Sequence, residues 1–140
     1  MSLASLTEIN YLAVCLAAIA SYVLGGLWYA VLFSKPWAKA YGFEEGEAIK
    51  LWKNPGATLS ALLLGDLVGA FVIALFIVSL GMQSEVKGAL IGLLLWLGAA
   101  GAYGLGAQMA STRSLQGYVI DTGRQLASFV LMGAILGVWH

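Results

Sequence analysis

The stretch Gly117–Trp139, which reads GYVIDTGRQLASFVLMGAILGVW, decides the fold class of this chain. It is longer than the ~20 apolar residues that an α-helix, rising about 1.5 Å per residue, needs to cross the hydrocarbon core of a bilayer. Asp121 and Arg124 lie near its start. Because ionised groups inside a membrane carry a high free-energy cost, the stretch predicts a transmembrane helix whose two charges need partners.

The composition of the whole chain is typical of a membrane protein. Of its 140 residues, 61% are hydrophobic and 10% are charged, whereas roughly a quarter of the residues in soluble domains are charged. The four expected spans cover residues 10–33, 57–80, 86–110 and 115–139. Since a spanning helix satisfies its backbone hydrogen bonds internally, we predict an all-α integral membrane bundle of four transmembrane helices, with residues 1–140 forming a single domain.

The connection between the first two spans, residues 34–56, carries most of the lysines. They are Lys35, Lys39, Lys50 and Lys53, whereas the loop on the opposite side of the membrane has only Lys87. The positive-inside rule therefore places residues 34–56 in the cytoplasm and both termini outside. The expected location is a plasma membrane, of the bacterial inner-membrane kind, crossed several times.

Short interfacial helices are expected within residues 34–56. Pro36 suits a first helical turn, Gly42 suits a helix end, and the triplet Asn54-Pro55-Gly56 predicts a break before the second span. Aromatic residues alternate with lysines, as in helices that lie at the headgroup level. The expected lipid-interface residues are Lys35, Trp37, Lys39, Lys50, Trp52 and Lys53. Recruitment of a partner protein is the alternative role for this loop.

Small residues recur at helical spacing in the last three spans. The pairs Gly65 and Gly69, Gly88 and Gly92, and Gly133 and Gly137 form G-x-x-x-G motifs, and Gly98, Ala102, Gly106 and Ala110 form one row. Such rows let helix backbones approach closely in lipid, where apolar burial does not drive association. We therefore predict tight packing, with the third span at the centre of the bundle.

The charges within the spans are predicted to meet. At 1.5 Å per residue, Asp66 and Arg124 each lie about 14 Å from the cytoplasmic ends of their helices, and Asp121 lies about 9 Å deep. Asp121 and Arg124 are three residues apart and share a helical face, so Arg124 is expected between the two carboxylates. Two acids and one base leave a negative charge, which a proton, water or a cationic ligand would balance.

Other polar and aromatic side chains fall in the same half of the membrane. The candidate binding or polar-clamp residues are Asp66, Asp121, Arg124, Tyr29, Trp28, Tyr103, Gln108 and Gln125. If these side chains converge, they line a pocket that opens to the cytoplasm. The alternative is a structural role, in which the polar cluster fixes helix register and the aromatic residues form an interface belt.

Several classes of chemistry lack the residues that they require. His140 is the sole histidine and Cys15 the sole cysteine, so neither bis-histidine haem ligation nor a four-ligand zinc site is expected. No phosphate-binding glycine loop and no nucleophilic triad is present. The formal net charge is zero, which argues against a nucleic-acid partner. We expect no enzymatic activity, no cofactor and no metal.

Two segments resemble a known family of small membrane proteins. They are INYLAVCLAAIASYVLGGLWYAVLFSKPW from Ile9, and GALIGLLLWLG with YVIDTGRQLASFVLMGAILGVW from Gly88 onward. The LWY followed by K-x-W, and the I-D near the start of the last span, are their most specific parts. They resemble the family known as domain of unknown function 1761. The resemblance implies a four-helix integral membrane protein and no established activity.

The resulting functional hypothesis is a non-enzymatic membrane protein that acts by association, as a homo-oligomer or as an accessory subunit of another membrane protein. Asp66, Asp121 and Arg124 would form its internal polar clamp. The alternative is a small proton-coupled transporter or a membrane protein that binds a solute or lipid. The lipid bilayer is a partner in either case, and the sequence does not identify a small-molecule ligand.

Overall fold

The computed structural model describes residues 4–42, 44, 53–111 and 114–139, and every regular element in these ranges is a helix. Four helical segments are long and apolar enough to cross a membrane. They are Tyr11–Leu32, Pro55–Leu80, Glu85–Ala110 and Leu115–Val138. The predicted all-α bundle with four spans is therefore confirmed, and the boundaries differ from the expected ones by only a few residues.

Two of the spans contain a π-helical stretch. In chain order the elements are α1 (Ala4–Glu8), α2 (Tyr11–Leu27), the π-helical η1 (Trp28–Leu32), α3 (Ser34–Ala40), α5 (Pro55–Leu80), α6 (Glu85–Leu95), the π-helical η2 (Trp96–Ala102), α7 (Tyr103–Ala110) and α8 (Leu115–Val138). The first span is thus α2 with η1, and the third is α6, η2 and α7. Single π-helical turns inside α-helices are rare and often occur at functional sites.

The long connection contains one described short helix, α3. Gly42 follows α3 with a left-handed φ of 76°, as expected of a helix end. The second short helix was expected in residues that include Lys50 and Trp52, which lie outside the described ranges. The predicted break before the second span is instead its beginning, because Pro55 occupies the first helical turn of α5 and the Asn54 side chain accepts a hydrogen bond from the Ala57 N–H.

Helix α8 is at the centre of the bundle, where the third span was predicted. It contacts α2, α3, α5, α6, η2 and α7. The row Gly98, Ala102, Gly106 and Ala110 is exposed, so the prediction of a central third span is wrong. Small residues define a face on which a close neighbour fits, but they do not decide how the helix is rotated toward its neighbours.

The closest helix contact joins α6 to α8 through two of the predicted glycine motifs. A Cβ built on Gly88 would lie 2.0 Å from the Gly133 carbonyl oxygen, and one built on Gly92 would lie 2.1 Å from the Phe129 carbonyl oxygen. Gly137 faces the Ser84 carbonyl oxygen in the same way, at 2.1 Å. These two motifs are therefore used within one chain rather than between chains.

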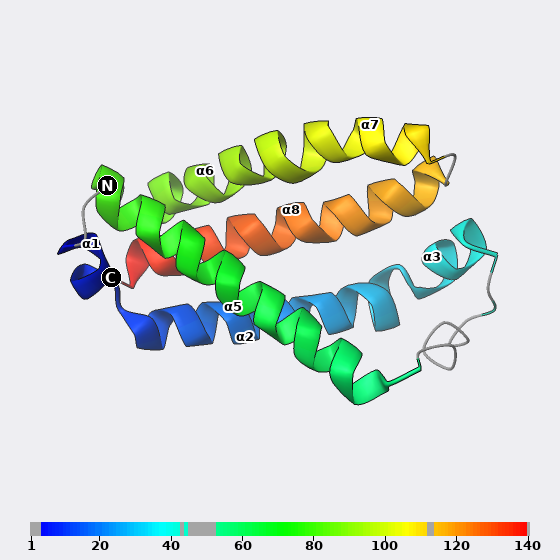
Figure 1. Ribbon diagram of the computed structural model, residues 1–140, viewed down its shortest axis with the longest axis horizontal. Helices are drawn as coiled ribbons and strands as arrows, with labels where there is room; N and C mark the ends of the chain where they lie inside the picture. Colours follow the sequence, from blue (N-terminus) through cyan, green and yellow to red (C-terminus); the bar gives the residue numbers. More distant parts are fainter. Residues whose placement is uncertain (1–3, 43, 45–52, 112–113, 140) are drawn as a thin grey trace.

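The two ends of the bundle differ in packing. In Figure 1, α1 and the end of α8 lie at one end, α3 lies at the other, and α5 crosses the bundle diagonally. The buried apolar core includes Ala17, Ile73, Ile77 and Met132. These residues come from the first half of α2 and the second halves of α5 and α8, so the dense core lies toward the α1 end. The remaining halves of these helices surround the polar site.

Candidate functional site

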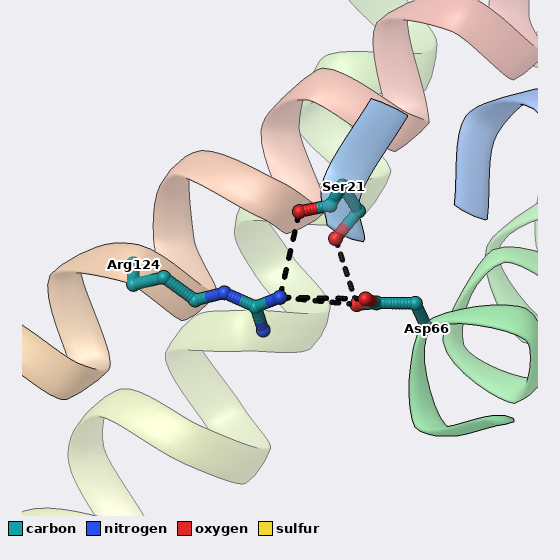
Figure 2. A network of polar contacts seen from close by, with 3 residues as sticks. All are labelled: Ser21, Asp66 and Arg124. Atoms are coloured by element: carbon teal, nitrogen blue, oxygen red, sulfur yellow. Dashed lines mark hydrogen bonds and ion pairs between the residues drawn. The ribbon is translucent and has the colours of Figure 1, made fainter. Parts of the chain in front are cut away.

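Asp66 of α5 and Arg124 of α8 form an ion pair inside the bundle, as Figure 2 shows. Arg124 Nη2 lies 3.3 Å from Asp66 Oδ2, and the Asp66 side chain is only 6% exposed. The Ser21 O–H donates a 2.7 Å hydrogen bond to Asp66 Oδ1, and the Ser21 carbonyl oxygen lies 3.4 Å from Arg124 Nη2. One polar cluster thus joins α2, α5 and α8.

Arg124 makes its hydrogen bonds to described residues through Nη2 alone. The other terminal nitrogen, Nη1, points away from Asp66 and Ser21 in Figure 2. Nε is buried and has no hydrogen-bond partner in the described part of the chain. Charge-assisted N–H···O bonds are usually 2.7–2.9 Å long, so the contact at 3.3 Å compensates the guanidinium only in part.

The guanidinium of Arg124 lies directly against the backbone of α2. A Cβ on Gly25 would come within 2.7 Å of Arg124 Nη2 and 3.0 Å of Nε. Glycine at this position therefore lets the arginine side chain pass α2 and reach Asp66. This gives Gly25, within the sequence GGLWY, a role in positioning Arg124.

Asp121 does not share Arg124 with Asp66, which corrects the prediction of an arginine held between two carboxylates. Its Oδ1 accepts hydrogen bonds from Tyr29 Oη at 2.7 Å and Trp37 Nε1 at 2.9 Å, and its Oδ2 accepts one from Tyr41 Oη at 2.7 Å. Within the described ranges, Arg124 has an ion pair with Asp66 only. The three neutral donors stabilise the Asp121 carboxylate, so Arg124 extends toward Asp66 instead.

These donors attach α3 to the bundle. Trp37 and Tyr41 are one helical turn apart and both reach Asp121 on α8. The Tyr41 ring fits over Gly117, where a Cβ would lie 2.5 Å from the ring, and Trp37 also meets Tyr29 edge-on with ring centroids 5.7 Å apart. Trp37 therefore contacts the protein core rather than serving only as the lipid-interface anchor that we predicted.

The lysines around α3 fit the interfacial role better than Trp37 does. Lys35, Lys39 and Lys53 are exposed in the structure. Lysine side chains at such positions place their charge in the headgroup layer while their methylene stems cover apolar surface.

A cavity of about 770 Å³ lies beside this polar cluster, between α2, η1, α3, α5 and α8. Its polar and aromatic wall includes Tyr22, Tyr29, Trp37, Glu44, Asp121, Arg124 and Gln125. Its remaining wall includes Gly25, Gly26, Ala30, Ala38, Leu59 and Leu62. No group of three or more His, Cys, Asp or Glu side chains in the described ranges is placed to hold a metal ion. The side chains that line the cavity supply charge, hydrogen-bonding groups and aromatic faces.

Several predicted site residues lie elsewhere. Tyr103 is 79% exposed, Gln108 donates to the Ser114 carbonyl oxygen in the turn before α8, and Trp28 Nε1 donates to the Ile120 carbonyl oxygen at 3.0 Å. Only Asp121, Arg124, Tyr29 and Gln125 of the predicted set line the cavity, and Asp66 lies behind Arg124.

The contributors to the site that were not predicted include Ser21, Tyr22, Gly25 and Tyr41. The one available signal was the four-residue spacing between Trp37 on α3 and Tyr41, the residue that follows α3, which places both on one side. Serine and glycine are common in membrane helices because they permit close packing, so Ser21 and Gly25 could not be distinguished from other small residues.

The fold and the site define a class, that of multi-pass helical membrane proteins with a buried ion pair beside a mixed polar and apolar cavity. The chain belongs to the family described as a protein of unknown function (DUF1761), whose model matches residues 12–137. The match extends from the first span into the fourth and includes both charged residues of α8. No curated protein and no solved structure matches the chain.

Proposed function

We propose that this chain is a non-enzymatic membrane protein that binds an amphiphilic small molecule in the cavity between α2, α3, α5 and α8. The observation that carries this proposal is an apolar cavity into which both Asp121 and Arg124 open. Its volume, about 770 Å³, is within the range of 300–1,000 Å³ that is typical of small-molecule sites. Such sites combine mostly apolar walls with a few polar groups that orient the ligand.

The buried ion pair supports both a structural and a binding role. Asp66 is enclosed and joins α5 to α8, as expected of a polar clamp. Arg124, in contrast, also faces the cavity and keeps unused donors. Charged groups within a membrane bundle usually mark a ligand or ion site, so Arg124 is proposed to serve the ligand as well as the clamp.

Binding is favoured over proton-coupled transport by the packing at the α1 end. A transport path needs polar groups at both depths of the membrane. The described core toward the α1 end is filled by apolar side chains such as Ile73, Ile77 and Leu136. This arrangement supports a site that opens at the α3 end.

Filling the cavity by Gly26→Phe is expected to expel the bound amphiphile. Gly26 lines the cavity, and a Cβ at this position meets nothing within 4 Å, so the substitution adds bulk without a backbone clash. Native mass spectrometry of the protein released from membranes would count retained lipid-sized molecules. We expect their occupancy to fall by about tenfold, which corresponds to 1.4 kcal/mol.

Gly65→Phe is the matched control for this experiment. Gly65 is an exposed helical glycine outside the cavity lining, and a Cβ there also meets nothing within 4 Å. It should retain the wild-type amount of bound molecule. Equal retention by Gly26→Phe and the wild type would show that the cavity is not the binding site.

Association with another membrane chain is a second candidate function, supported by the exposed row Gly98, Ala102, Gly106 and Ala110. A Cβ on Gly98 or Gly106 meets no described residue within 4 Å, so a partner helix would fit closely on this face. If a homo-oligomer forms here, Gly98→Leu with Gly106→Leu should abolish cross-linked dimers in membranes, and Gly65→Leu should not. Unchanged dimers in the double variant would rule out this face.

The expected orientation belongs to the same proposal. The lysine-rich residues 34–56 would face the cytoplasm of a bacterial cell, with both termini outside. Trypsin added to sealed spheroplasts should then leave this loop intact, and it should cleave the loop in inverted vesicles. Cleavage in spheroplasts would reverse the orientation.

A further inference from the structure

Arg124 on α8 lines the cavity and has hydrogen-bond donors that no described residue uses. Arg124 Nη1 carries two N–H groups that have no partner among the described residues, while Asp66 binds only through Nη2. The planar guanidinium matches the oxygen geometry of phosphate, to which arginine donates several hydrogen bonds. An anionic group that enters the cavity would therefore find a donor at Arg124.

The same wall presents a negative group one turn closer to the start of α8. The Asp121 carboxylate accepts two hydrogen bonds at Oδ1 and one at Oδ2, all from neutral donors. A carboxylate offers about four acceptor positions, so Oδ2 retains one. Tyr29 and Trp37 line the cavity beside it, and their ring faces attract cations. This part of the wall is suited to an ammonium group.

The order of the two charges along α8 matches one kind of headgroup. Residues three apart on a helix share a face, and ethanolamine and choline phospholipids carry a phosphate and an ammonium joined by a two-carbon link. Asp121 lies closer to the α3 end and Arg124 lies deeper. In a phospholipid the ammonium is likewise outermost, the phosphate is next, and the acyl chains follow toward the bilayer centre.

We infer that the cavity recognises a zwitterionic phospholipid headgroup, with its phosphate at Arg124 and its ammonium at Asp121. This inference rests on the proposed binding function and specifies its ligand class. Leu59 and Leu62 of α5 supply apolar wall at the level of the headgroup. A purely anionic headgroup would satisfy Arg124 but place more negative charge beside Asp121, which also lines the cavity.

Competition between lipids tests the inference on the wild-type protein, so it does not depend on any variant folding. The delipidated protein is offered equal amounts of phosphatidylethanolamine and phosphatidylglycerol with the same acyl chains, and bound lipid is counted by native mass spectrometry. We expect a preference of about tenfold for phosphatidylethanolamine. Equal binding, or a preference for phosphatidylglycerol, would overturn the inference.

Three variants test whether the charges of Asp121 and Arg124 cause the preference for phosphatidylethanolamine. Asp121→Asn removes the carboxylate charge and should abolish the preference. Arg124→Lys keeps the positive charge beside Asp66 but removes the planar guanidinium, and it should weaken the binding of both lipids. Glu85→Gln, at the exposed start of α6, is the control and should keep the wild-type preference. A preference that survives Asp121→Asn would overturn the assignment of the ammonium.

Two further experiments distinguish a lipid from a soluble ligand, and distinguish failure of the headgroup inference from failure of the proposed cavity function. Glycerophosphoethanolamine, which has the headgroup without acyl chains, should not displace the lipid at equal concentration; if it does, the ligand is a soluble zwitterion and not a lipid. Gly26→Phe should prevent binding of both phospholipids. If the lipids bind Gly26→Phe as they bind the wild type, the proposed cavity function fails. If Gly26→Phe binds neither lipid but the wild-type protein binds both lipids equally, the cavity is the binding site and only the headgroup inference is overturned.

Discussion

Gly133→Leu is expected to lower the free energy of unfolding strongly, because it separates α6 from α8. A Cβ on Gly133 would lie 2.1 Å from the Gly88 carbonyl oxygen and 3.3 Å from Ala89 Cα. Because these obstacles are backbone atoms, α6 and α8 must move apart to admit even one methyl group. Overpacking commonly costs 1–3 kcal/mol, and separation of the closest helix pair should place the loss at about 3 kcal/mol or more.

The measurement is reversible unfolding in mixed micelles, followed by helical circular dichroism. Gly98→Leu is the matched control, since it adds the same side chain to a membrane-span glycine whose Cβ meets nothing within 4 Å. It should keep or slightly raise stability, because leucine has a higher helix propensity than glycine by up to about 1 kcal/mol. Equal stabilities for Gly133→Leu and Gly98→Leu would show that α6 and α8 do not pack as closely as the structure has them.

These two glycines also show what the sequence could predict about the fold. Hydropathy alone predicted the four spans, and the G-x-x-x-G motifs correctly indicated close packing for Gly88 and Gly133. The spacing of Gly98 and Gly106 is as regular, yet both are exposed. Regular spacing places small residues on one face, but the packing of all four helices decides whether that face meets protein or lipid.

The site shows the same limit for charged residues. Helix rise placed Asp66 and Arg124 at equal depth, and they form the ion pair. Local spacing wrongly paired Asp121 with Arg124, because the partners of Asp121 come from elements far away in the sequence. Tyr29 and Tyr41 precede it by 92 and 80 residues. No periodicity within α8 could indicate that neutral aromatic donors would stabilise this carboxylate.

The ion pair itself leads to the second large effect, which a double-mutant cycle should reveal. Asp66→Asn leaves Arg124 without its counter-charge, and Arg124→Gln leaves Asp66 buried beside only the Ser21 hydroxyl and backbone. Removing one partner of a buried pair typically costs about 3–5 kcal/mol, because an uncompensated charge remains. Each single variant should therefore be strongly destabilised in the same micelle assay.

The double variant Asp66→Asn with Arg124→Gln should recover much of that loss. Its two amides remove both charges, so no ionised group is left unpaired inside the bundle. We expect a coupling free energy of about 2 kcal/mol or more, within the range measured for contacting residues. Strictly additive losses would mean that the charges act independently and that the pair does not hold α5 to α8. A large coupling free energy would show that Arg124 holds α5 to α8. If Arg124→Lys also weakens lipid binding, Arg124 has both a structural and a binding role, since the ion pair uses Nη2 and leaves Nη1 for the ligand.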